Sequence, residues 1–355
     1  MPKRTRVGVG LFPASPPVRQ YEVAVGSGHT LSVREWGSGP TPVVYLHGGP
    51  GGGTPPDICK LFDPEQFRLV AFDQRGCGRS RFEERLRENT CDALVSDIEA
   101  VRQEAGGIET WGVMGSSYGV LLASLYAARH PARARWVLLH GCFTGSRAEL
   151  EWLYEGGAAR FYPAQWAAFE AALGTPPPLP PDAALPHVAA YARLICPRKA
   201  AAADADAEAE AAAAVAAATA FVRWEDELET LEPHADDDGG MSTADLLGQC
   251  EIQLHHFGHG CFMPSDAGAL PELRAASGAL SGVRCAIIHG RHDMVCPPRA
   301  AAQLQALWPS ATLRIVESGA HALFEKPMRS AAQACLAEFA AGAGHVGVSG
   351  RHACS

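Results

Sequence analysis

Short apolar runs, rich in β-branched side chains, recur along the chain, and each is followed by a turn that contains glycine. The runs lie at residues 43–46, 68–72, 111–114, 135–139, 285–289 and 313–316. Helix-like stretches lie between most of them, at residues 91–105, 118–129, 299–307 and 328–340. Near-continuous apolar strands that alternate with helices are typical of a parallel sheet with helices on both faces. The pattern therefore predicts a doubly wound α/β fold.

This alternation is interrupted between residues 141 and 275. The interruption contains an aromatic segment at 151–169, a turn-rich segment at 174–186 and a tract of alanine and acidic residues at 200–220. Alanine is the best helix former, so the tract is expected to be a solvated helix rather than a linker. The predicted layout is a flexible basic tail (1–20), a first core part (21–140), a helical cap (141–275), a second core part (276–340) and a Gly-rich tail (341–355).

Composition narrows the class of protein. The chain has 355 residues, of which 47% are hydrophobic, which is ample for one large core with a smaller inserted domain. A net charge of −9 argues against a nucleic-acid surface, and the lack of a long apolar run argues against a membrane span. Eleven cysteines without a CxxC spacing favour a reduced, cytoplasmic protein. For the first 20 residues, which carry four basic and no acidic side chains, an organellar leader is the alternative to a basic tail.

The segment GSSYG at residues 115–119 contains the candidate nucleophile. A serine on a tight turn from strand to helix needs small residues two positions away on either side, as in the pattern G-x-S-x-G. Only one register satisfies this pattern, with Gly115, Ser117 and Gly119. Centring the motif on Ser116 would put Met114 at a glycine position. Ser117 is therefore the predicted nucleophile.

An activated serine also needs a base and an acid that orients it. In hydrolases with a strand–serine–helix turn, the chain order is serine, acid, histidine. Asp293 and His321 follow the last two predicted strands in that order. Each alone is unremarkable, as a turn aspartate or a surface histidine, but together they predict a Ser117–Asp293–His321 triad.

The glycine-rich segment YLHGGPGGG at residues 45–53 follows the first strong strand. Its backbone N–H groups are candidates to stabilise a developing oxyanion, and we expect Gly49 to act together with the N–H of Tyr118. The run lacks the spacing of a dinucleotide fingerprint and has no GK[ST], which makes phosphate binding the weaker interpretation.

Several stretches resemble the prolyl aminopeptidase (proline iminopeptidase) family of α/β-hydrolases, from about Tyr21 to Ala340. They are HGGPGGG at 47–53, the segments 61–81 and 88–102, the serine turn, GRHDMVC at 290–296 and SGAHALFE at 318–325. The resemblance implies an α/β-hydrolase fold with an inserted helical cap. It implies a serine aminopeptidase that removes N-terminal proline from small peptides through an acyl-enzyme, without a metal or organic cofactor.

Selecting a free N-terminus requires carboxylates that face the substrate's ammonium group. By resemblance Glu225 is one of these carboxylates. The place of a second is occupied by Gln253, and Glu251 is the nearby carboxylate that could replace it. The resemblance also assigns an apolar pocket for the pyrrolidine ring, with ordinary core packing as the alternative role of its members. They are Phe143, Tyr154, Phe257 and Cys296.

Three residues depart from the family pattern. Ser116 and Tyr118 flank the nucleophile where the family usually has glycine and tryptophan, and His140 stands where an arginine is expected. Gln253 and His140 favour a second hypothesis, a serine esterase or amidase of the same fold. A third hypothesis is a non-catalytic binding protein. The cluster of His255, His256, His259 and Cys261 suggests zinc, but its spacing matches no standard pattern, so no metal is expected.

Overall fold

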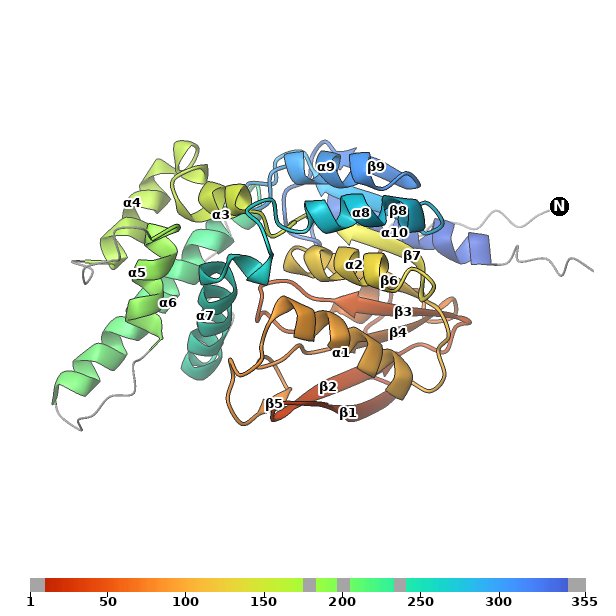
Figure 1. The fold of residues 1–355 in the computed structure, drawn as a ribbon, viewed down its shortest axis with the longest axis horizontal. Helices are drawn as coiled ribbons and strands as arrows, with labels where there is room; N and C mark the ends of the chain where they lie inside the picture. Colours follow the sequence, from red (N-terminus) through yellow and green to blue (C-terminus); the bar gives the residue numbers. More distant parts are fainter. Residues whose placement is uncertain (1–9, 175–182, 197–204, 233–240, 344–355) are drawn as a thin grey trace, which may run out of the picture.

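The computed structural model describes residues 10–174, 183–196, 205–232 and 241–343. Nine strands in these ranges form one sheet, in the order β1-β2-β4-β3-β6-β7-β8-β9 with β5 paired to β2 (Figure 1). The strands are β1 (Arg19–Gly26), β2 (His29–Trp36), β3 (Thr41–Leu46), β4 (Phe67–Phe72), β5 (Arg81–Phe82), β6 (Trp111–Ser116), β7 (Ala134–His140), β8 (Arg284–Gly290) and β9 (Ala311–Val316). From β4 to β9 every neighbouring pair is parallel. The predicted α/β-hydrolase architecture is confirmed.

Helices cover both faces of the sheet. On one face lie α1 (Cys91–Glu104), α2 (Tyr118–Arg129), α8 (Leu270–Leu280) and α9 (Arg299–Leu307). The other face is covered by α10 (Lys326–Ala343) and a short 3₁₀ helix (Ile58–Leu61). Both layers are apolar, and the central strands carry almost no exposed side chains, which is why these strands read as continuous apolar runs.

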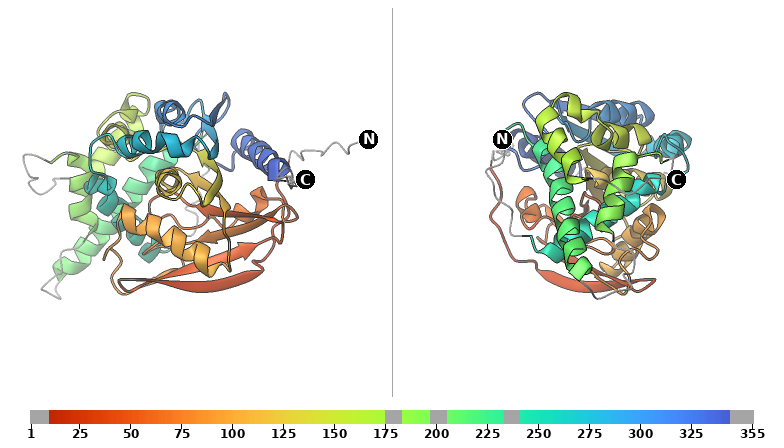
Figure 2. Two further views of the ribbon diagram at one scale, coloured as in Figure 1. Left: turned by 45° about the vertical axis from the view of Figure 1, so that its right-hand side comes forward. Right: turned by 90° about the vertical axis from the view of Figure 1, so that its left-hand side faces the viewer.

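Five helices form the cap at one end of the sheet, as the views in Figure 2 show. They are α3 (Arg147–Tyr154), α4 (Pro163–Ala172), α5 (Pro186–Ile195), α6 (Ala205–Glu229) and α7 (Thr243–Gly258). Short 3₁₀ turns at Ala158–Arg160 and Gly260–Phe262 complete this region. The alanine and acid tract forms α6 as predicted from residue 205 onwards, whereas residues 200–204 lie outside the described residues.

The boundaries differ from the predicted layout in three places. The expected flexible tail is shorter than 20 residues, because Phe12 donates a backbone hydrogen bond to Lys60, Ser15 accepts one from the Trp36 indole, and β1 begins at Arg19. The boundary near residue 275 falls inside α8, which packs on α2 in the core. At the other end α10 extends to Ala343, beyond the predicted start of the tail. Residues 1–9 and 344–355 lie outside the described residues.

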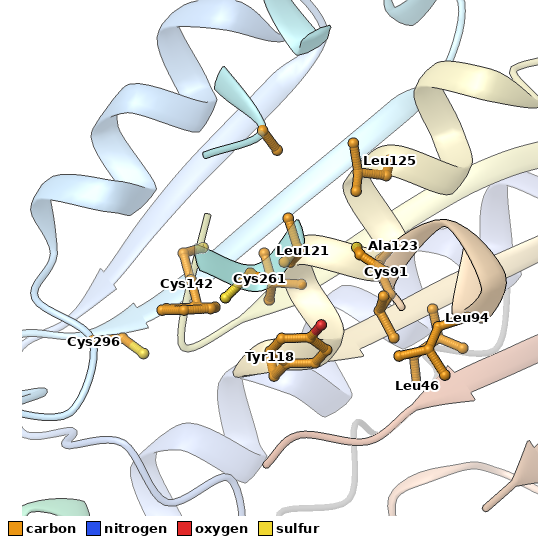
Figure 3. Packing of buried hydrophobic residues seen from close by; sticks show 14 of the residues in the cluster. Leu46, Cys91, Leu94, Tyr118, Leu121, Ala123, Leu125, Cys142, Cys261 and Cys296 are labelled. Atoms are coloured by element: carbon orange, nitrogen blue, oxygen red, sulfur yellow. The ribbon is translucent and has the colours of Figure 1, made fainter. Parts of the chain in front are cut away.

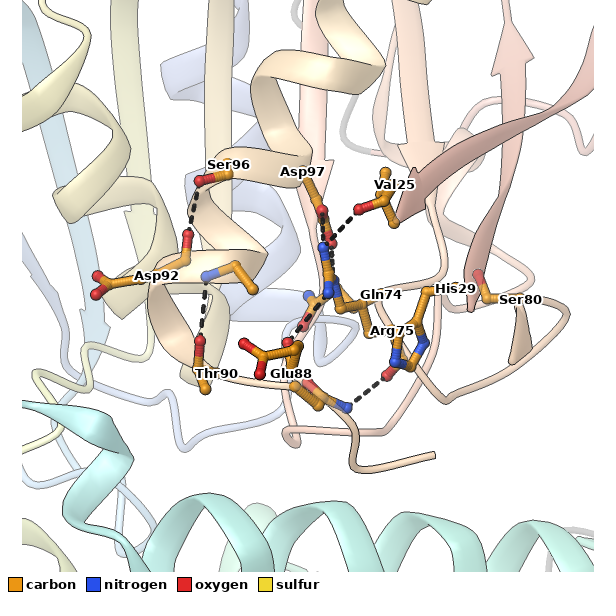
Figure 4. A network of polar contacts seen from close by, with 12 residues as sticks. Val25, His29, Gln74, Arg75, Ser80, Glu88, Thr90, Asp92, Ser96 and Asp97 are labelled. Atoms are coloured by element: carbon orange, nitrogen blue, oxygen red, sulfur yellow. Dashed lines mark hydrogen bonds and ion pairs between the residues drawn. The ribbon is translucent and has the colours of Figure 1, made fainter. Parts of the chain in front are cut away.

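A buried ion pair fixes the loop that follows β4. Arg75 donates to both carboxylate oxygens of Asp97 on α1 at 2.7 and 2.8 Å, and also to the carbonyls of Val25 and Glu88 (Figure 4). A buried guanidinium needs such a set of acceptors, since an unpaired buried charge is strongly unfavourable. The ion pair thereby ties β1, α1 and the segment DQRGCGRS together.

No helix within the described ranges is long and apolar enough to cross a membrane. The ten cysteines in these ranges are free thiols, and Cys354 lies outside them.

Candidate active site

Ser117 sits on the tight turn between β6 and α2. Its backbone has φ 56° and ψ −123°, a strained conformation for a residue other than glycine, and its side chain is partly exposed between buried neighbours. A Cβ on Gly115 would lie 2.3 Å from the carbonyl oxygen of Gly119, and a Cβ on Gly119 would lie 2.1 Å from that of Leu46. Both glycines of the motif are therefore required by contact with backbone atoms.

Replacing Gly119 by alanine is expected to destabilise the fold by about 3 kcal/mol or more, because rigid backbone cannot yield to the new methyl group. Chemical denaturation followed by circular dichroism would measure the change. Gly278→Ala is the matched control: Gly278 is exposed on α8, and no atom lies within 4 Å of the place that a methyl group would take, so this change should be neutral or stabilise by up to about 1 kcal/mol. Equal stability of the Gly119 variant and the wild type would contradict the steric argument.

His321 and Asp293 lie together at the carboxyl end of the sheet. His321 Nδ1 is 2.8 Å from Asp293 Oδ2, while Asp293 Oδ1 accepts the Cys296 N–H at 2.8 Å. The carboxylate holds the Nδ1–H tautomer, which leaves Nε2 free to act as a base. Gly141 makes room for the ring, since a Cβ there would lie 2.9 Å from His321 Cε1.

The charges around His321 favour its protonated form. Burial lowers its pKa, but the charge and hydrogen bond of Asp293, assisted by Glu229 and Glu225, outweigh burial and raise the pKa above its ordinary value. Burial likewise raises the pKa of Asp293, and His321, His289 and the Cys296 N–H reverse this, so that Asp293 remains ionised at neutral pH.

Ser117 and His321 both line one pocket of about 430 Å³ beneath the cap. Among the hydrogen bonds of the described residues, none joins the Ser117 hydroxyl to the His321 ring; the hydroxyl instead lies against the Cys296 thiol. Catalytic hydrogen bonds are often loose in a protein without substrate and tighten when substrate binds. The two groups thus share a pocket in which a substrate carbonyl can reach both.

The predicted oxyanion donors line the same pocket. Tyr118 is the first residue of α2, where an N–H has no partner within the helix, and Gly49 lies on the loop after β3. The loop is held by the residues that follow β4. Gln74 donates its backbone N–H to His47 Nε2 at 3.1 Å and its side-chain amide to the His47 carbonyl at 2.9 Å, while Asp73 accepts the Thr54 N–H at 2.8 Å.

The cap places Glu225 on the wall of this pocket. The neighbouring Trp224 is buried and donates its indole N–H to the Leu153 carbonyl at 2.8 Å, which ties α6 to α3. Glu225 then accepts hydrogen bonds from the Tyr154 phenol and from the Gln253 side-chain amide, at 3.1 and 2.9 Å for the latter. Burial, with the carboxylates of Asp226 and Glu229, raises the pKa of Glu225 to about 7 against the effect of these bonds.

The four predicted apolar residues also line the pocket. Phe143 lies between the Tyr118 and Phe257 rings, at centroid distances of 6.0 and 6.2 Å, and Phe257 lies 5.4 Å from Tyr154. Phe257 and Gln253 are four residues apart on α7 and so lie on one face of that helix. Figure 3 shows Tyr118 with Cys142, Cys261 and Cys296 in the same buried cluster.

Comparison with known proteins identifies the family of this chain. A model of the α/β hydrolase fold matches residues 41–327. Proline iminopeptidases of Xanthomonas citri and Neisseria gonorrhoeae are 34% and 33% identical, over 89% and 82% of this chain and 94% and 86% of theirs. The chain belongs to the proline iminopeptidase family of α/β hydrolases. The enzyme from Arabidopsis thaliana is 35% identical over 89% of this chain and 78% of its own.

Solved structures agree on the fold of this family. The crystal structure of a Mycobacterium smegmatis proline iminopeptidase covers 92% of this chain and all of its own, with a TM-score of 0.56 at 19% identity. A meta-cleavage product hydrolase from Pseudomonas fluorescens covers 91% of this chain and 98% of its own, with a TM-score of 0.54 at 16% identity. At these identities the likeness extends to the fold alone.

Glu251 and the histidine cluster of the cap both contact protein groups outside the pocket. Glu251 does not replace the missing carboxylate, because its side chain pairs with Arg85 at 3.1 Å. In the histidine cluster, His255 Nε2 and His256 Nε2 lie 3.1 and 3.2 Å from the carbonyl and side-chain oxygens of Asn89. In the described part of the chain, no three His, Cys, Asp or Glu side chains are arranged to hold a metal ion.

Two groups that contact the candidate triad on the side away from the pocket were not predicted from the sequence. His289 on β8 accepts the Cys142 N–H on Nδ1 at 3.1 Å, so its Nε2 carries the proton that faces the Cys296 carbonyl at 2.7 Å and Asp293 at 3.4 Å. The carbonyl of Glu229, at the end of α6, accepts the backbone N–H groups of His321 and Ala322 at 2.9 and 3.0 Å. The only sequence signal for His289 was its position one residue before GRHD; nothing local signalled the second contact.

Proposed function

We propose that this member of the proline iminopeptidase family is a serine aminopeptidase that releases N-terminal proline from small peptides. The observation that carries the proposal is Glu225, a carboxylate on the wall of the pocket that also holds Ser117 and His321. When substrate displaces water from the pocket, such a carboxylate must either take up a proton or meet a cationic group on the substrate. The amine at a free N-terminus is that group.

The chemical step uses Ser117 from the first core part and His321 with Asp293 from the second. Ser117 attacks the carbonyl of the first residue, and His321 Nε2 takes its proton, while Asp293 holds the ring and stabilises the imidazolium. The N–H groups of Gly49 and Tyr118 stabilise the oxyanion. His321 then donates its proton to the leaving amine, and water hydrolyses the prolyl ester of Ser117 by the same steps.

Substrate selection follows from the walls of the pocket. The rings of Phe143, Tyr154 and Phe257, with the Cys296 thiol, form an apolar surface that suits a pyrrolidine ring. Beside them Glu225 accepts hydrogen bonds from the substrate's ammonium group. The amide of Gln253 donates to this carboxylate but adds no charge, and Gln253 itself is buried outside the pocket lining, so Glu225 is the group that faces the substrate's amine.

A panel of substrates tests the proposal. We expect proline p-nitroanilide to be cleaved at least about 100-fold more efficiently than its N-acetyl derivative, because acetylation removes the cation that pairs with Glu225. A chromogenic assay of kcat/KM on both compounds, beside a short-chain p-nitrophenyl ester, makes the comparison. Equal cleavage of the blocked and free compounds would overturn ammonium recognition.

A second function, a serine esterase or amidase, is favoured by the presence of Gln253 where a second carboxylate is expected. With a single carboxylate that has a pKa of about 7, the site is uncharged for part of the time at neutral pH. If this function is the true one, the short-chain ester in the same panel will be hydrolysed faster than proline p-nitroanilide.

A further inference from the structure

Two of the residues that depart from the family pattern are bonded to each other. Ser116 ends β6 and His140 ends β7, and they are register partners across the parallel pair. Both side chains are buried, and Ser116 Oγ lies 2.6 Å from His140 Nδ1 in a shared hydrogen bond. The Tyr45 phenol lies against the same hydroxyl. His140 Nε2 is buried and has no partner in the described part of the chain.

His140 contacts both halves of the candidate catalytic apparatus. Its carbonyl accepts the Ser117 N–H at 2.9 Å, so the backbone at this position fixes the strained turn. Its ring centroid lies 6.1 Å from that of His321, with the planes tilted by 43°. A charge on this ring would therefore act directly on the general base.

The groups that face His321 come from three parts of the chain. Asp293 and His289 belong to the second core part, Glu225 and Glu229 to α6, and His140 to β7. Burial, the neighbouring His321 and His289 lower the pKa of His140 to about 3 against the effect of Asp293, which makes this ring neutral. Burial also lowers the pKa of His289. At neutral pH the charged groups around His321 are consequently carboxylates.

We propose that Ser116 and His140 form a neutral pair beside the His321 ring and thereby set the pH at which this imidazole becomes a base. The serine gives His140 a hydrogen-bond partner without giving it a charge. A glycine at position 116 would remove that partner and leave both ring nitrogens of a buried histidine unsatisfied. A cation at position 140 would oppose protonation of His321. Both departures are thus parts of one device, which explains their presence in the same chain.

The test compares a charged with a neutral replacement. The double variant S116G/H140R introduces a cation and makes room for it, whereas His140→Gln keeps the position neutral. The rate at which a fluorophosphonate labels Ser117 is measured against pH. We expect the wild-type midpoint to lie above about pH 6.5, since the carboxylates raise the pKa of His321. The double variant should lower the midpoint by about one pH unit. At one pH unit below the wild-type midpoint, its labelling rate, as a fraction of its own plateau rate, should then be about fivefold that of the wild type.

The His140→Gln variant should leave the midpoint within about 0.3 pH units of wild type, by the same reasoning. An unchanged midpoint in S116G/H140R, or an equal shift in His140→Gln, overturns the proposal. Should the arginine variant not fold, NMR of the wild-type protein with ¹⁵N-labelled histidine provides a second test. His140 should keep a neutral ring across the pH range in which His321 titrates. Protonation of His140 within that range would contradict the proposal.

This inference rests on the acyl-transfer mechanism proposed above but not on proline. Labelling by a fluorophosphonate needs Ser117 and His321 and no ammonium group. If the substrate panel shows selection for free proline but the pH midpoints do not shift as expected, only the neutral pair is refuted. If the midpoints shift as expected but the blocked and free substrates are cleaved equally, only proline selection is refuted.

Discussion

Replacing Ser117 by alanine is expected to reduce kcat for proline p-nitroanilide about 10⁵–10⁶-fold while leaving the protein folded. The reason is that this hydroxyl is the attacking group in the proposed mechanism, and alanine has no group that can replace it. Labelling by a fluorophosphonate, followed by intact mass spectrometry, should disappear completely. Circular dichroism and the melting temperature should remain close to those of the wild type.

Ser124→Ala is the matched control for this substitution. Ser124 lies on α2, two turns beyond the nucleophile, and its buried hydroxyl has no hydrogen-bond partner in the described part of the chain. Removing that hydroxyl should leave both activity and labelling intact. If the Ser117 variant kept a tenth of its activity, or if labelling moved to another residue, the assignment of the nucleophile would be wrong.

Replacing Glu225 by glutamine is expected to lower kcat/KM for proline p-nitroanilide about 100-fold. The substitution keeps the shape of the side chain but removes the charge that pairs with the substrate's ammonium group. Hydrolysis of an uncharged short-chain ester should change by less than about threefold, because that compound has no ammonium group to lose. Steady-state kinetics on the two substrates separate these outcomes.

The pH dependence of the wild type offers a check on the same residue. Because the pKa of Glu225 is raised to about 7, the carboxylate is ionised above this pH and increasingly neutral below it. KM for the prolyl substrate should therefore rise as the pH falls below 7, and the Glu225→Gln variant should lose this dependence.

Glu227→Gln is the control for the Glu225 substitution. Glu227 lies on α6 beside Arg223, away from the pocket lining, and its loss should leave kcat/KM unchanged. An equal loss in both variants would mean that overall charge, not ammonium recognition, is responsible.

Much of the fold was predictable because its signals are local. Five of the six predicted strands, β3, β4, β6, β7 and β8, are mostly buried and therefore appear as continuous apolar runs, while β9 at the sheet edge is only partly buried. Helices α2 and α9 begin and end at the predicted residues. The missed hairpin of β1 and β2 lies at the edge of the sheet. There β1 alternates between exposed and covered side chains, so it offers no continuous apolar run.

The parallel α/β core, the register of the serine turn and the candidates Ser117, Asp293 and His321 could be predicted from the sequence, because each was recognised from a short motif or apolar run. Which polar groups meet became evident only from the tertiary structure. It paired Glu251 with Arg85, Glu225 with Gln253 and Tyr154, His256 with the Tyr118 phenol, and His140 with Ser116. These contacts join residues 24 to 166 positions apart. Their partners are fixed by the packing of whole helices and strands, and no local pattern of side chains encodes such distances.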